Sequence, residues 1–157
     1  MKRIVIAADV SGSMYGQGKD CILEQAVKCV RDTISAYAGE GDEAAYYACS
    51  SGELREILFP DNIPAIPEPK GRFSFQPLTL LLEQASPKPA YIILLSDGSF
   101  DKKEAAAFKE YCGGQGIIPY SFMVGADCQE GNLHKASRAA FNIYDIAAVL
   151  EELCVGE

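Results

Sequence analysis

Short runs rich in apolar residues recur along the chain, and each run ends at an aspartate, serine, proline or glycine. Runs of this length are typical of strands that are buried in a sheet. The pattern predicts six strands, at residues 4–8, 43–49, 54–59, 91–95, 117–124 and 141–144. The polar turn at residues 50–53 joins the second strand to the third, which predicts a hairpin and therefore one antiparallel pair.

The stretches between these runs predict helices. In residues 19–38 the apolar side chains recur at helical spacing and the charged ones take the opposite face, as in an amphipathic helix. Further helices are expected at residues 74–85, 102–112, 132–139 and from 145 to about 154. The predicted N-cap residues of three of them are Ser74, Asp101 and Asp145.

The alternation of strands and helices predicts an α/β fold. We expect a doubly wound, mostly parallel six-stranded sheet of Rossmann-like type, with one antiparallel edge strand and helices on both faces. Residues 60–73 are the exception, because their four prolines favour a stiff surface loop. The 157 residues contain no internal repeat and no linker, so a single domain over residues 1–157 is predicted.

The composition narrows the classes of function. The chain carries 22 acidic and 14 basic side chains, a net charge of -8, which argues against nucleic acid as a partner because phosphates attract clustered lysine and arginine. No apolar run approaches the roughly 18 residues of a membrane span, so no membrane partner is expected. The apolar stretch after Arg3 ends at Asp9, too early for an export signal, which predicts a cytoplasmic protein.

The cysteines and the histidine do not suggest a metal site. The six cysteines are scattered without a Cys-x-x-Cys pair, and His134 is the one histidine. This spacing fits neither a zinc cluster nor a disulfide framework, so we expect reduced thiols that lie mostly in the core.

Oxygen-bearing residues follow two of the predicted strands. Asp9 and Asp97 stand where these strands end, and ligands of open α/β sheets bind at the carboxyl ends of the strands. Ser11 and Ser13 follow Asp9 at alternate positions with Gly12 between them, so both hydroxyls are expected to point the same way. Two carboxylates and two hydroxyls form an oxygen-only set, which suits Mg²⁺ or Mn²⁺ rather than zinc or copper.

Residues 9–13, Asp-Val-Ser-Gly-Ser, match the D-x-S-x-S motif of the von Willebrand factor A (vWA) domain. The resemblance extends through most of the chain. Residues 41–44, Gly-Asp-Glu-Ala, resemble the start of the family's second strand, and Ser96-Asp97-Gly98 is similar to its third metal loop.

This resemblance implies a metal-ion-dependent adhesion site. Ser11 and Ser13 would bind Mg²⁺, Mn²⁺ or Ca²⁺ directly, and Asp9 and Asp97 largely through water. A carboxylate from a partner protein would fill the open coordination position of the ion.

The chain departs from the family at the second metal loop, which usually offers a threonine. An ungapped match places Phe73 in the threonine position, and phenylalanine cannot bind a metal. Ser74 is the favoured substitute. Thr79 is the alternative, although its use leaves few residues for the following helix. The third hypothesis for this loop is that it supplies no ligand and that the metal site is degenerate.

Three functions follow from these residues. The leading hypothesis is a non-enzymatic module that captures an acidic residue of another protein, and short bacterial members of the family suggest work beside an AAA+ ATPase or in a stress-response system. A metal-free scaffold is the alternative that Phe73 favours. A Mg²⁺-dependent phosphoryl-transfer enzyme is a further alternative, although Ser11 stands where such enzymes need a second aspartate. A phosphate loop at residues 16–19 is disfavoured, because Asp20 replaces the Ser or Thr that should follow the lysine.

Overall fold

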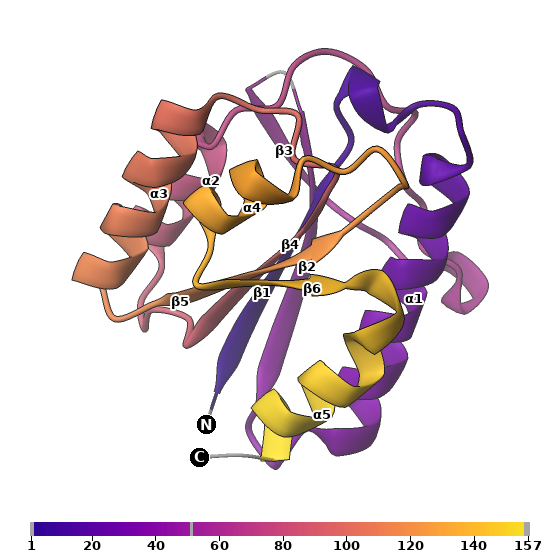
Figure 1. Cartoon of the computed structure of the whole chain (residues 1–157). Helices are drawn as coiled ribbons and strands as arrows, with labels where there is room; N and C mark the ends of the chain where they lie inside the picture. Colours follow the sequence, from indigo (N-terminus) through magenta and orange to yellow (C-terminus); the bar gives the residue numbers. More distant parts are fainter. Residues whose placement is uncertain (1, 51, 156–157) are drawn as a thin grey trace.

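The computed structural model describes residues 2–50 and 52–155. Within these residues, six strands form one sheet in the order β3-β2-β1-β4-β5-β6 (Figure 1). The strands are β1 (Arg3–Asp9), β2 (Glu43–Ser50), β3 (Glu53–Glu56), β4 (Tyr91–Ser96), β5 (Ile118–Met123) and β6 (Ala139–Asn142). All neighbouring strands are parallel except β2 and β3, which form the antiparallel hairpin at one edge. The predicted fold class is confirmed.

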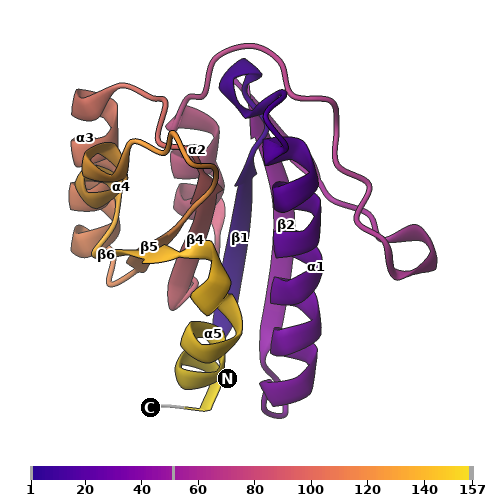
Figure 2. The same cartoon turned by 45° about the vertical axis from the view of Figure 1, so that its right-hand side comes forward.

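Five helices in the described part of the chain cover the sheet on both faces (Figure 2). On one face α1 (Lys19–Tyr37) packs against α5 (Ile146–Val155). The other face is covered by α2 (Gln76–Gln84), α3 (Lys102–Gly114) and α4 (Glu130–Ala136). Within residues 2–50 and 52–155, no helix is both long and apolar enough to cross a membrane.

The sheet separates two apolar cores, and β1 supplies both by simple alternation. Ile4, Ile6 and Ala8 face the core under α1 and α5, whereas Val5 and Ala7 face the core under the other helices. The six cysteines are free, and three of them, Cys49, Cys112 and Cys154, are buried. Both layers therefore hold β1 in the centre of the molecule, with its carboxyl end fixed between them.

The predicted helix caps are only partly correct. Asp101 caps α3, because its carboxylate accepts two backbone N–H groups of the first turn at 2.8 and 3.0 Å. The prediction for Ser74 is wrong: α2 begins at Gln76, and Phe75 takes the N-cap position without a side-chain cap. The Ser74 hydroxyl instead accepts the N–H of Gln76 at 3.3 Å, in a turn just before the helix.

The last strand lies earlier than its apolar pattern predicts, because β6 spans Ala139–Asn142 and not residues 141–144. A 3-10 turn, η3 (Ile143–Asp145), occupies the end of the predicted strand and leads directly into α5. The side chain of Asn142 accepts the N–H of Tyr144 at 2.9 Å and so caps this turn. Asn142 is therefore the cap of η3. Asp145 is the residue directly before α5, and its role as the cap of that helix stays a prediction.

The packing of α2 can be tested with two leucines of the same helix. Leu82 is fully buried, whereas Leu80 is 48% exposed. We expect Leu82→Ala to lower the free energy of unfolding by about 2–5 kcal/mol, because it removes buried apolar surface and leaves a cavity. Leu80→Ala should change it by less than about 0.5 kcal/mol. Urea denaturation of both variants measures the difference, and equal losses would contradict the packing described here.

Candidate functional site

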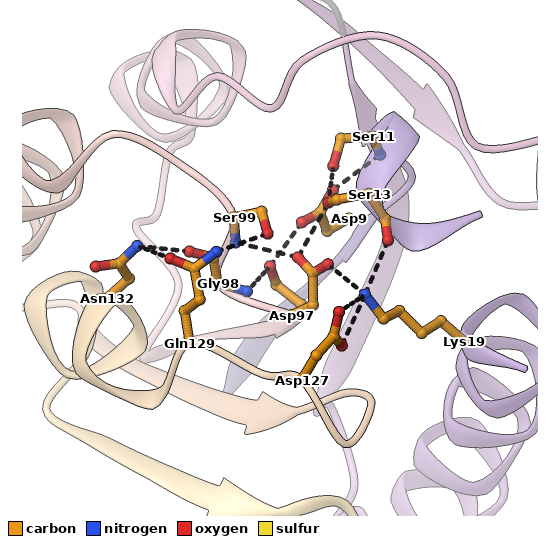
Figure 3. Close-up of polar contacts among 11 residues, drawn as sticks. Asp9, Ser11, Ser13, Lys19, Asp97, Gly98, Ser99, Asp127, Gln129 and Asn132 are labelled. Atoms are coloured by element: carbon orange, nitrogen blue, oxygen red, sulfur yellow. Dashed lines mark hydrogen bonds and ion pairs between the residues drawn. The ribbon is translucent and has the colours of Figure 1, made fainter. Parts of the chain in front are cut away.

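The candidate site lies at the carboxyl edge of the sheet, where β1 and β4 end side by side. The two strands pair in parallel, with Ala8 opposite Leu95. The residues that follow on each strand therefore meet at this edge. Asp9 forms a hydrogen bond with Ser96 and lies near Asp97 (Figure 3). The convergence expected from the sequence is present in the structure.

Asp9 is a fully buried carboxylate with a partner on each oxygen. Its Oδ1 accepts the backbone N–H of Ser11 at 2.9 Å, and its Oδ2 accepts the hydroxyl of Ser96 at 2.6 Å. Burial raises the pKa of Asp9 to about 6, and these hydrogen bonds offset the effect only in part. A positive charge at this edge would therefore favour the ionised form of Asp9.

The two serine hydroxyls of the motif lie side by side, in keeping with the expectation that alternate spacing points both the same way. Ser11 Oγ and Ser13 Oγ lie 3.3 Å apart, and the Ser13 hydroxyl donates to Asp97 Oδ1 at 3.2 Å. Ser13 belongs to a tight turn, η1 (Gly12–Met14), and Ser11 directly precedes it; the buried Met14 side chain anchors this turn in the core. Ser11 is buried and Ser13 is exposed, so the pair reaches from the interior to solvent.

The proline-rich loop is joined to this turn through the backbone. The N–H of Gly12 donates to Gly71 O at 2.8 Å, and the N–H of Lys70 donates to Val10 O at 2.9 Å. These two hydrogen bonds fix the loop beside the serine pair, which explains how a segment without regular structure keeps a defined place at the site.

Asp97 is the second buried carboxylate, and it has a different set of partners on each oxygen. Oδ1 accepts the Ser13 hydroxyl and also the backbone N–H of Ser99, at 3.1 Å. Oδ2 accepts the Lys19 ammonium at 3.0 Å. Gly98 follows with φ +79°, and a Cβ there would lie 2.5 Å from Gln129 O, so this turn requires glycine.

Lys19 is the part of the site that the motif did not indicate. Its side chain is only 5% exposed and lies at the start of α1, where Nζ donates to Ser13 O, Asp97 and Asp127. Burial lowers the pKa of Lys19, but the hydrogen bonds to Asp127 and Asp97 outweigh it, and the net shift is upward. The sequence did contain a signal: Lys19 is one turn before Leu23 on the buried face of the helix.

Phe73 belongs to the core and not to the site. It is 1% exposed and packs against Phe75 and Phe100, with ring centroids 4.9 and 5.6 Å apart. Phe73 is therefore a core residue and does not take part in metal binding.

The two proposed substitutes for that threonine make local contacts. Ser74 Oγ accepts the N–H of Gln76, and the Thr79 hydroxyl donates to Phe75 O at 3.2 Å within α2. Among the described residues, neither hydroxyl makes a hydrogen bond to Asp9 or Asp97. Metal ligation by Ser74 stays a prediction.

No protein-family model matches the sequence, and no curated protein matches it either. Solved structures do match. The manganese-loaded TRAP protein of Plasmodium vivax has a TM-score of 0.74 at 10% identity, over 99% of this chain and 73% of that one. An aerotolerance-related membrane protein from Bacteroides fragilis has a TM-score of 0.71 at 13% identity, over 96% of both chains. A von Willebrand factor type A protein from Catenulispora acidiphila has a TM-score of 0.68 at 18% identity, over 98% of this chain and 42% of that one.

This chain has the fold of a von Willebrand factor type A domain. At such low identities the likeness concerns the fold, so the chemistry of the site has to be argued from this chain's own residues. In this vWA fold the D-x-S-x-S turn and the Ser-Asp-Gly turn occupy neighbouring strand ends, as the sequence resemblance implied.

The donor set of this vWA fold fits a hard divalent cation. The Ser13 hydroxyl lies within hydrogen-bond distance of both the Ser11 hydroxyl and the Asp97 carboxylate. All three groups offer oxygen ligands, which hard divalent cations prefer. Among the described residues, no three His, Cys, Asp or Glu side chains form a metal-binding group. A cation here would therefore depend on the serine hydroxyls, not on a cluster of carboxylates.

The hydrogen bond from Ser96 to Asp9 can be tested by removing the hydroxyl. Ser96→Ala leaves Asp9 Oδ2 buried without its donor and the Gly98 N–H without its acceptor. We therefore expect the free energy of unfolding to fall by about 1–3 kcal/mol. Ser99→Ala is the matched control, because the Ser99 hydroxyl accepts a hydrogen bond from the Gln129 side chain near the surface. Urea denaturation should show a clear loss for the first variant and little change for the second. A stability of Ser96→Ala equal to the parent would contradict the assigned role.

Proposed function

We propose that the chain is a non-enzymatic protein-interaction module of vWA type. Asp9, Ser11, Ser13 and Asp97 hold Mg²⁺ or Mn²⁺, with Ca²⁺ as a further candidate, and Ser74 is the candidate for an additional ligand. When bound, the cation supplies a positive charge with an open position for a carboxylate of a partner protein.

One observation carries this proposal. The hydroxyls of Ser11 and Ser13 lie 3.3 Å apart, and the second of them contacts Asp97 from the neighbouring strand end. Side-by-side hydroxyls next to a carboxylate are an oxygen set of the kind that hard cations prefer. Because Ser13 is exposed, an acidic side chain of another protein can reach this edge from solvent.

The contacts of Asp9 and His134 favour binding over catalysis. Both oxygens of the buried Asp9 are engaged, by the Ser11 N–H and the Ser96 hydroxyl, so Asp9 is poorly placed to attack a phosphoryl group. His134, the one histidine of the chain, lies on α4 within 3.7 Å of Glu130, and so it is not paired with either serine as a general base.

The metal-free scaffold is the second candidate, and two observations favour it. Phe73 is buried where the family has a threonine ligand, and Lys19 already places a positive charge on Asp97. In that case partners would bind through the surface alone. Work beside an AAA+ ATPase or in a stress-response system, and a cytoplasmic location, stay predictions.

Metal binding can be measured directly on the purified chain. In isothermal titration with Mn²⁺ we expect one binding site in the parent protein. The double variant Ser11→Ala and Ser13→Ala should bind at least about tenfold more weakly, a loss of about 1.4 kcal/mol, because it removes both direct hydroxyl ligands.

The control for this titration is Ser99→Ala, which removes a nearby hydroxyl outside the donor set. It should bind Mn²⁺ like the parent. If the parent shows no heat of binding at millimolar Mn²⁺, the metal-free scaffold is favoured. Equal affinities of the parent and the double variant would place any bound ion elsewhere.

Carboxylate capture needs a separate experiment. Immobilised protein is offered two libraries of C-terminally amidated peptides whose varied positions exclude Asp and Glu. One library has Asp or Glu at a fixed central position, and the other has Asn or Gln there. We expect capture of the acidic library only, with loss of capture after treatment with EDTA. Equal retention of both libraries, or retention that ignores EDTA, would show that no metal-bound carboxylate is involved.

A further inference from the structure

Lys19 brings a buried positive charge into direct contact with the candidate metal site. Its ammonium donates to Ser13 O at 3.0 Å, to Asp97 Oδ2 at 3.0 Å and to Asp127 Oδ2 at 2.8 Å. These three partners belong to three different loops: the turn after β1, the turn after β4 and the loop after β5 (Figure 3). One ammonium therefore links all three loops at the carboxyl edge of the sheet.

The loop after β5 is shaped around the Lys19 side chain. Gly125 in this loop has φ +88°, and a Cβ built on it would lie 2.9 Å from Lys19 Cε and 3.1 Å from Lys19 Cγ. The absence of a side chain at Gly125 therefore makes room for the stem of Lys19. Asp127, which follows in the same loop, is 54% exposed and gives the ammonium its partner nearest to solvent.

The entry into α1 also favours this position of Lys19. Gly16, Gln17 and Gly18 all have positive φ, at 80°, 53° and 75°, and they turn the chain sharply between the serine pair and the helix. As the first residue of α1, Lys19 is 4% exposed. A lysine is rarely buried to this extent unless its charge is paired, and here two carboxylates pair it.

We propose that Lys19 is an internal cation of the site: it holds the three loops together without a metal ion, and its charge on Asp97 lowers the affinity for divalent cations. The proposal deepens the proposed function and rests on it, because Ser11, Ser13 and Asp97 belong to the donor set proposed there. It assigns Lys19 a regulatory role. The ammonium holds the loops of the site in place before a metal ion binds, and its positive charge repels the metal ion.

The physical reason is competition for one carboxylate. Asp97 offers Oδ1 to the Ser13 hydroxyl and Oδ2 to the ammonium, so a divalent cation beside Ser13 shares Asp97 with a positive charge. Repulsion between like charges is strong at short range in a partly buried site. Replacing Lys19 by a neutral residue of similar length removes this repulsion and leaves Asp97 with an uncompensated charge, which a metal ion can then neutralise.

The test is isothermal titration calorimetry of Lys19→Met with Mn²⁺. Thermal melting is a second readout. We expect Lys19→Met to bind Mn²⁺ at least about tenfold more tightly than the parent. In EDTA the variant should melt at a lower temperature than the parent, because the link between the loops is lost. Mn²⁺ should then raise its melting temperature by more than it raises that of the parent.

Lys28→Met is the matched control, because Lys28 lies on the same helix and pairs with Asp32 at the surface. It should leave both Mn²⁺ affinity and melting temperature unchanged. The triple variant Lys19→Met, Ser11→Ala and Ser13→Ala should lose the gain in affinity, which locates the gain at the serine pair. If Lys19→Met does not fold in EDTA, the neutral but polar Lys19→Gln is titrated instead. Failure of both variants to fold even with Mn²⁺ would contradict the claim that a metal ion can neutralise Asp97 in place of the ammonium.

The outcomes separate this proposal from the proposed function. If the parent binds Mn²⁺ and a folded Lys19→Met or Lys19→Gln binds it equally or more weakly, the role of Lys19 is wrong and the metal site stands. If the parent is silent and the neutral variant binds Mn²⁺ through Ser11 and Ser13, the role of Lys19 is supported, and the natural chain works as a metal-free scaffold. If neither binds Mn²⁺, both proposals fail.

Discussion

The parallel pairing of β1 with β4 is the constraint on which the whole site depends. Ala8 and Leu95 lie opposite each other in the centre of the sheet, with an apolar core on each face. The next residues along each strand leave the cores together, at one edge. Asp9 and Asp97 are therefore brought together by backbone register, and no long-range contact between their side chains is needed to place them.

This placement carries a cost, since two carboxylates are removed from water. The structure compensates each of them differently. Asp9 receives hydrogen bonds from the Ser11 N–H and the Ser96 hydroxyl, and its raised pKa shows that the compensation is incomplete. Asp97 receives a full positive charge from Lys19. The buried carboxylates at this edge are thus compensated by hydrogen bonds and by one positive charge, which the protein itself supplies through Lys19.

Much of this arrangement could be predicted from the sequence, because it depends on local rules. Apolar runs that end at Asp9 and Asp97 indicated two neighbouring strand ends, and the alternate spacing of Ser11 and Ser13 indicated hydroxyls on the same side. The helix caps were less predictable: Ser74 lies one residue before the observed N-cap, because Phe75 enters the aromatic core and sets where α2 begins.

The role of Lys19 could not be predicted from the motif, because it depends on three loops that are far apart in the chain. Its partners Asp97 and Asp127 are fixed by the ends of β4 and β5, and the space for its stem depends on Gly125. The one local sign was its position on the buried face of α1, before Leu23. A charged residue on an apolar helix face is worth examining for a buried partner.

The central claim is that the turns holding residues 9–13 and 96–99 form one cation site. Paramagnetic broadening of backbone amide signals by Mn²⁺ tests it most directly, since this effect reports position even when binding is weak. The account predicts that broadening at low Mn²⁺ begins at the amides of these two turns and is lost when Ser11 and Ser13 are both alanine. Broadening that begins elsewhere, such as at Glu151 and Glu152 on α5, or that persists unchanged in the double variant, would contradict it.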